Sequence, residues 1–255
     1  MYLKQYRDLI AYKVYADLQA EASRNYLSFL WWIIEPVMYM AVFYVVFGLL
    51  FKRGNGPDYI PFLLTGLTLW KWFDASVRAG ASSIRANSQL MHQINLPKII
   101  FPLIAIAQTT LRSGVVLVLL LVFIELVGPG ISPTYTALPV LLLVQFILTC
   151  ACAFALAAIV PFIPDISQLI GNIMVLLMFL SGIFYSGKSI PEQFQNFFYM
   201  NPMATLLESY REILLYHTWP DWGRIATIAV LSAIFLFITA QIIFKLDKVY
   251  PKIIT

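Results

Sequence analysis

The sequence of 255 residues is short of charge, of cysteine and of histidine. Only 12% of its residues are charged, about half the share found in an ordinary soluble domain. Because so few charges cannot cover a water-facing surface, the composition excludes a soluble globular protein, a disordered chain and a nucleic-acid binder. The two histidines and two cysteines stand in no metal-ligand or nucleophile motif, which leaves metal-dependent and triad-type catalysis without support.

Apolar residues make up 60% of the chain, and its mean hydropathy is +0.79. Runs such as VVLVLLLVFIELV at 115–127 lack the alternation of a membrane β-barrel strand. They have the length and composition of transmembrane helices instead. The sequence therefore predicts an all-α integral membrane protein with six transmembrane helices, over residues 27–51, 59–77 with an extension to 85, 101–126, 135–162, 166–185 and 225–244.

Residues 1–26 mix apolar and charged side chains. Apolar residues recur at steps of three and four from Leu3 to Leu18, which predicts an amphipathic helix lying in the membrane interface. The alternative is a surface helix packed on the rest of the protein. Residues 27–255 then form one six-span transmembrane domain.

Lys and Arg residues predict the orientation. More of them lie in segments on the side of the amino terminus than on the other side, so both termini are predicted to be cytoplasmic. The 84–102 loop is then cytoplasmic and the 187–224 segment lies outside. Because proline and charge interrupt the outer segment, it is predicted to form short re-entrant helices between spans five and six rather than a span.

Residues 182–189, GIFYSGKS, match the G-x-x-x-x-G-K-[ST] pattern of phosphate-binding loops. An apolar span precedes them where a phosphate loop needs a strand, so we interpret them as a span end at which Gly187 turns the chain. Cys150 and Cys152 are two residues apart in one predicted helix, and their side chains point to different faces. They are therefore predicted to be core residues without a disulfide.

Lys71, Asp74 and Arg78 share one helical face near the cytoplasmic side, and Arg85 prolongs it. This face is either a hydrophilic entrance for an anionic group or an ion-pair cluster in which Asp74 pairs with both neighbouring cations. The first predicted span carries a stripe of aromatic residues. Such a stripe faces lipid, packs in the core, or lines a conduit where sugar rings stack on it.

Three segments in register resemble the permease subunits of polysaccharide ABC exporters, the ABC-2 class that exports O-antigen, capsule or teichoic acid. They are SRNYLSFLWWIIEP at 23–36, INLPKIIFP at 94–102 and YMNPMATLLESYREILL at 199–215. The resemblance covers essentially the whole chain. It implies a homodimer in the bacterial cytoplasmic (inner) membrane that works with two copies of a cytoplasmic ABC ATPase. The ATPase would bind ATP and Mg, so this chain would need no cofactor of its own.

The implied substrate is a polysaccharide linked to polyprenyl diphosphate. The substrate channel is assigned to Trp32, Tyr39, Phe43, Phe47, Phe184 and Tyr185. The cytoplasmic entrance is assigned to Arg24, Lys71, Asp74, Arg78 and Arg85. Coupling to the ATPase is assigned to Met91, His92, Asn95, Leu96, Pro97 and Lys98. The outer re-entrant gate is assigned to Pro191, Phe197, Phe198, Asn201, Pro202 and Arg211.

Two other functions stay open at this point. An ABC-2 permease for a small lipid or drug would share the topology without needing a continuous aromatic lining. An integral membrane enzyme acting on lipid-linked sugars would need convergent carboxylates or histidines at one membrane face, and the sequence shows no such pattern.

Overall fold

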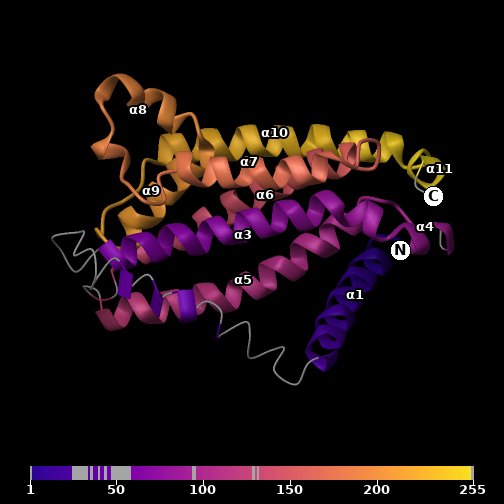
Figure 1. Cartoon of the computed structure of the whole chain (residues 1–255), viewed down its shortest axis with the longest axis horizontal. Helices are drawn as coiled ribbons and strands as arrows, with labels where there is room; N and C mark the ends of the chain where they lie inside the picture. Colours follow the sequence, from indigo (N-terminus) through magenta and orange to yellow (C-terminus); the bar gives the residue numbers. More distant parts are fainter. Residues whose placement is uncertain are drawn as a thin grey trace.

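Throughout the described part of the chain, all regular structure is helical, as predicted. The computed structural model describes residues 2–24, 34, 37–39, 41–42, 45–46, 59–93, 96–127, 130 and 132–253. Most of the first predicted span lies outside these residues, and with it Trp32, Phe43 and Phe47; Asn95 also lies outside them. The long helices after residue 59 lie roughly lengthwise beside one another, whereas the helix over residues 2–24 runs across their direction (Figure 1).

The helices in chain order are α1 (Tyr2–Arg24), α3 (Tyr59–Ala86), α4 (Ser88–Gln93), α5 (Ile100–Val127), η2 (Pro133–Ala137), α6 (Leu138–Ile159), α7 (Ile166–Leu180), η3 (Gly187–Ser189), α8 (Glu192–Tyr199), α9 (Pro202–Leu214), α10 (Trp222–Leu246) and α11 (Tyr250–Ile253). Within the described residues, three stretches are long and apolar enough to cross a membrane: α5, η2 with α6, and α10. α7 is apolar but shorter, at 15 residues. The six-span count stays a prediction.

α3 is the central helix of the bundle. It packs against both α5 and α6, and α6 packs in turn against α10. Leu63 and Val77 of α3 are fully buried, which places the middle of the core along this helix. The predicted polar face lies on the side of α3 that is less buried: Lys71 and Arg85 are exposed, and Asp74 and Arg78 are partly buried.

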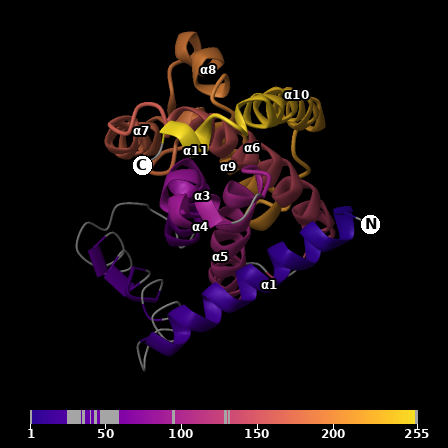
Figure 2. The same cartoon turned by 90° about the vertical axis from the view of Figure 1, so that its right-hand side faces the viewer.

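α1 packs its apolar side against α5. Val14 is buried against Ile100 and Ile104. The Gln108 side chain donates a hydrogen bond of 2.8 Å to Asp17. Figure 2 shows α1 crossing the end of α5. A helix therefore forms in this segment as predicted, and one side of it packs against α5, as the alternative of a packed surface helix also expects. Its amphipathic character and its position in the membrane interface stay predictions.

The fifth predicted span ends earlier than expected. Its helix, α7, stops at Leu180 rather than at residue 185, and Gly182 then takes a φ of +71°, a backbone conformation that favours glycine. Phe184 and Tyr185 consequently lie in the turn that follows. The 187–224 segment contains η3, α8 and α9, short helices as predicted, at the end of the bundle opposite to α1's start and α11 (Figure 1), and its position outside the membrane stays a prediction. Cys150 and Cys152 are free thiols.

Candidate functional site

An aromatic cavity of about 620 Å³ lies at the α8/α9 end of the bundle. It brings together two groups of predicted residues, because its lining includes Tyr185 of the channel set and four of the gate set: Phe197, Phe198, Asn201 and Pro202. Further aromatic walls come from α3 and α8, namely Trp70, Phe73 and Phe194. Phe184 of the channel set is not among the residues that line the cavity; its ring stacks on that of Phe179, with the two ring centroids 5.4 Å apart.

The polar groups of this aromatic cavity are used within the protein. The Asn201 amide donates to the Ser181 hydroxyl at 2.9 Å, and its oxygen accepts from the Met203 backbone N–H at 3.0 Å. The Tyr185 hydroxyl donates to the Phe179 carbonyl at 2.9 Å. What faces the cavity is therefore mainly apolar surface, to which six aromatic residues contribute, and this surface suits the C–H faces of sugars or an apolar chain better than an ion.

Arg211, which the sequence assigns to the outer gate, is buried and is not among the residues that line the cavity. Its side chain is 1% exposed and donates hydrogen bonds to the carbonyls of Phe62 (3.3 Å), Gly182 (2.8 Å) and Ile183 (2.9 Å). Its guanidinium carbon also lies 3.4 Å from the centroid of the Phe62 ring. Arg211 of α9 thus joins the start of α3 to the turn after α7, and we regard it as an anchor of the site.

Glu208 holds the same turn one helical turn earlier on α9. Its carboxylate accepts from the Ser186 hydroxyl at 3.0 Å and from the Gly187 backbone N–H at 3.2 Å. A Cβ on Gly187 would lie 2.5 Å from the Tyr199 hydroxyl, and one on Gly182 would lie 2.6 Å from the Phe198 ring. Both glycines of the phosphate-loop look-alike are therefore explained by packing under α8.

Asp74 and Arg78 form a partly exposed ion pair on α3, with Arg78 Nε 2.5 Å from Asp74 Oδ1. Arg78 also donates to the Gly171 carbonyl of α7 at 3.2 Å. The Lys71 ammonium lies 3.3 Å from the centroid of the Tyr39 ring. The structure thus brings a predicted channel residue and a predicted entrance residue into contact. The side chain of Arg24 lies outside the described part.

The predicted coupling segment is divided between buried and exposed residues. Met91 is buried and His92 is exposed, while Leu96 and Pro97 are partly buried. Lys98 is 3% exposed; its backbone N–H donates to Asp247 at 2.7 Å and its ammonium lies 3.5 Å from the same carboxylate. Lys98 therefore joins the loop to the end of α10. Its neighbours His92, Leu96 and Pro97 are at least partly exposed and could contact a partner.

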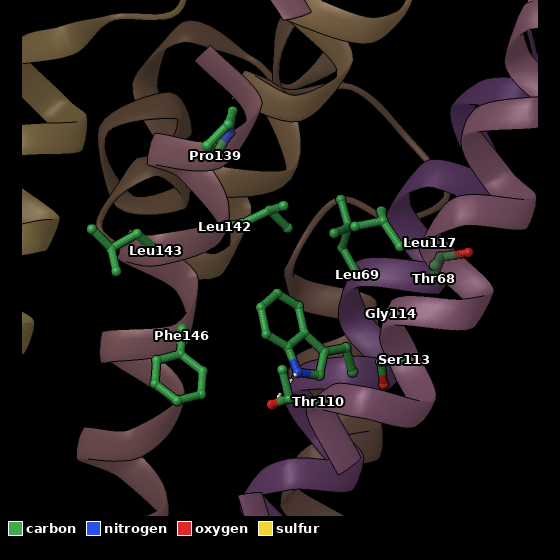
Figure 3. A pocket seen from close by; sticks show the side chains of 11 residues that line it. Thr68, Leu69, Thr110, Ser113, Gly114, Leu117, Pro139, Leu142, Leu143 and Phe146 are labelled. Atoms are coloured by element: carbon green, nitrogen blue, oxygen red, sulfur yellow. Dashed lines mark hydrogen bonds between the residues drawn. The ribbon is translucent and has the colours of Figure 1, made fainter. Parts of the chain in front are cut away.

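The sequence reasoning missed a second pocket, of about 430 Å³, between α3, α5 and α6 (Figure 3). One wall carries Ser113 and Gly114 of α5, and the other carries Leu143 and Phe146 of α6. The Trp72 indole donates to the Thr110 hydroxyl at 3.1 Å. The signal that could have found it is the group of small residues Thr109, Thr110, Ser113 and Gly114 within a helix of otherwise bulky side chains.

Residues 15–215 match the model of a protein family described as ABC-2 type transporter. The chain is 28% identical over 242 residues to an O-antigen export system permease protein RfbA of Myxococcus xanthus, an alignment covering 94% of this chain and 93% of that protein. It is 30% identical over 200 residues to the capsule polysaccharide export inner-membrane protein CtrC of Neisseria meningitidis serogroup A, covering 74% and 72% of the two chains. It is 23% identical over 224 residues to a polysialic acid transport protein KpsM of Escherichia coli, covering 87% of each. The match of residues 15–215 confirms the predicted family: this chain belongs to the ABC-2 type transporters.

Proposed function

We propose that this chain is the permease subunit of an ATP-driven exporter that moves lipid-linked polysaccharide across the bacterial cytoplasmic membrane. The observation that carries the proposal is the alignment with an O-antigen export permease over 94% of this chain and 93% of that protein. The relatives named for capsule and polysialic acid transport support the same class of substrate.

The geometry fits such a substrate at two places. The aromatic cavity offers ring faces on which sugars can stack, which suits a polymer of varied sequence because stacking needs no fixed hydroxyl pattern. Towards the other end, the half-exposed Arg78 and the exposed Arg85 offer guanidinium groups that suit a diphosphate. We propose that the substrate enters beside this α3 face and leaves beside the cavity.

The proposed exporter includes a second copy of this chain and two cytoplasmic ATPase subunits. ATP and Mg would bind to those subunits, and their motion would reach the membrane through α4 and the turn at Leu96 and Pro97. The exposed His92 on α4 fits a contact surface for such a partner.

Deleting the gene in its own host tests the proposal. We expect surface polysaccharide to fall by more than tenfold while lipid-linked polysaccharide accumulates inside, as measured by immunoblotting of cell surface and lipid extracts. Complementation with Tyr185→Ala or Phe197→Ala should restore export only in part. Phe237→Ala, at an exposed position of α10 outside the cavity, is the matched control and should restore it fully. Unchanged surface polysaccharide after deletion would favour the small-lipid or drug permease instead.

A further inference from the structure

A groove of about 760 Å³ runs beside α10, between that helix, α9 and α6. Its polarity changes along its length. Asp221, Arg224 and Tyr199 lie at one end, whereas Leu231, Phe235 and Leu148 line the rest. A charged rim that leads onto an apolar floor has the polarity order of a membrane lipid, whose headgroup is charged and whose tail is not.

The groove has the length of one lipid tail. From Asp221 to Phe235 the α10 backbone rises by about 21 Å. The hydrocarbon of a single leaflet is about 15 Å thick, half of the bilayer core. An acyl chain anchored at the rim can therefore lie against α10 without leaving the groove.

Two exposed tryptophans place the rim at headgroup depth. Trp219 and Trp222 are 55% and 42% exposed and flank Asp221, with ring centroids 6.4 Å apart. Exposed tryptophan on a membrane protein is enriched at the level of the headgroups, where an apolar ring and a polar N–H are both satisfied. This observation does not depend on the groove.

The rim carries one charge of each sign. Arg224 Nε lies 3.1 Å from Asp221 Oδ2, both side chains are more than half exposed, and the guanidinium lies 4.4 Å from the Tyr199 ring centroid. A ligand with a single charge meets repulsion from one of these two groups. A headgroup with a phosphate beside a primary ammonium can bind both, the phosphate at Arg224 and the ammonium at Asp221.

Carboxyl groups near the rim make the binding of a ligand with two phosphates unfavourable. Burial raises the pKa of the Glu212 carboxyl, and Glu208 raises it further. With Asp221, these carboxyl groups outnumber the cations Arg224 and Lys188 that act on Glu212. A diphosphate would add negative charge to this region, whereas a zwitterion adds none.

We propose that the groove beside α10 binds a phospholipid with a phosphate and a primary ammonium, that is, phosphatidylethanolamine. The headgroup lies on the Asp221–Arg224 pair and one tail lies along Ile228, Leu231 and Phe235. Phosphatidylcholine fits less well because its quaternary ammonium has no N–H to donate to Asp221, and phosphatidylglycerol because it lacks the cation. The groove adjoins the aromatic cavity and shares Leu148, Met200 and Pro202 with its lining, but the charged rim of Asp221 and Arg224 belongs to the groove alone. The proposal does not depend on which substrate the protein exports.

The test is lipid competition on the full permease–ATPase complex. The delipidated complex is titrated with mixed micelles of phosphatidylethanolamine, phosphatidylglycerol and phosphatidylcholine in equal amounts, and bound lipid is counted by native mass spectrometry. We expect wild type to retain phosphatidylethanolamine over each competitor by roughly threefold to tenfold, the range of one or two charge-assisted contacts at an exposed site.

Three variants separate headgroup from tail. Arg224→Gln should abolish the preference for phosphatidylethanolamine. Asp221→Asn keeps an N-capping side chain but loses the negative charge, so it should shift the preference towards phosphatidylglycerol. Thr227→Phe should lower the binding of all three lipids by filling the groove. Lys245→Gln, which removes an exposed cation at the other end of α10 and outside the groove, is the control and should bind like wild type.

Several results would overturn the proposal. They are equal retention of the three lipids by wild type, an unchanged preference in Arg224→Gln, and a cysteine at Thr227 that crosslinks two copies of the chain, since a second protomer would then occupy the groove. None of these results bears on export, so a failure here is distinguishable from a failure of the proposed function.

Discussion

The two ends of the helix bundle hold their loops by different means. At the α8/α9 end, the fully buried Arg211 donates hydrogen bonds to three backbone carbonyls. The Glu208 carboxylate accepts two hydrogen bonds from the turn after α7. At the other end, the Lys98–Asp247 and Gln108–Asp17 pairs each join two segments by one or two contacts. A planar guanidinium with five donors fixes several carbonyls at once, whereas single pairs can change partners. The comparison indicates a rigid frame beneath the aromatic cavity and a more adjustable junction near the predicted ATPase.

Replacing Arg211 should cause the largest loss. Arg211→Leu leaves the carbonyls of Phe62, Gly182 and Ile183 buried without their donor, and we expect unfolding free energy to fall by about 3–5 kcal/mol. Thermal unfolding of the purified protein measures this loss. Arg211→Lys keeps the charge but not the planar set of N–H donors, so its stability should lie between those of Arg211→Leu and wild type. An Arg211→Leu protein that melts like wild type would show that this anchor does not hold the site.

Gly66→Ala should disturb the same frame from the opposite side. A Cβ at Gly66 would lie 2.6 Å from the Arg211 guanidinium, so the arginine must shift from its carbonyl partners. We expect a loss of about 1–3 kcal/mol in thermal unfolding. Gly114→Ala is the matched control, because a Cβ there meets nothing within 4 Å and alanine favours the helix. Equal melting of the two variants would contradict the close packing of Arg211.

Sequence patterns predicted the helices better than they predicted the anchors. The apolar runs predicted α3, α5, α6 and α10, whereas the start of α9, where Asn201 caps the helix, was not predicted. The partners of Arg211 could not be predicted, because they are backbone carbonyls up to 149 residues away and carbonyls leave no residue-type signal. The partner of Lys98 was missed for a different reason: the Asp247 carboxylate is 149 residues distant, and the sequence offers other carboxylates as possible partners.

The candidate site was predicted in parts and not as a whole. Tyr185 and Phe197 were assigned to separate functions, channel and gate, yet they line one cavity. The early end of α7 brings them together, since Gly182 turns the chain back under α8. The sequence did not predict the groove at Asp221 and Arg224, because an N-capping acid with an arginine nearby is common at the start of a helix and does not indicate a binding site.

Lys98→Met should have a smaller effect than either change at the rigid end. It removes a single pair whose carboxylate partner is partly exposed, so we expect a loss of about 1–2 kcal/mol in thermal unfolding. We also expect ATP hydrolysis by the permease–ATPase complex to proceed without export. His92→Ala, on the exposed face of α4, is the companion variant and should reduce coupling without lowering the melting temperature. Coupled export in both variants would show that this loop does not transmit the motion of the ATPase.

Asp74→Asn should cost the least stability, below about 1 kcal/mol, because its pair with Arg78 is partly exposed. This small effect lets the variant decide between the two interpretations of the α3 face. If the face is an entrance, Arg78→Gln should reduce polysaccharide export severalfold at an unchanged melting temperature. Asp74→Asn should then keep export or increase it, since the guanidinium is released for the phosphate. If the face is a structural ion-pair cluster, both variants should lose stability and export together, and Arg78→Gln should lose more of both because it also loses the hydrogen bond to the Gly171 carbonyl.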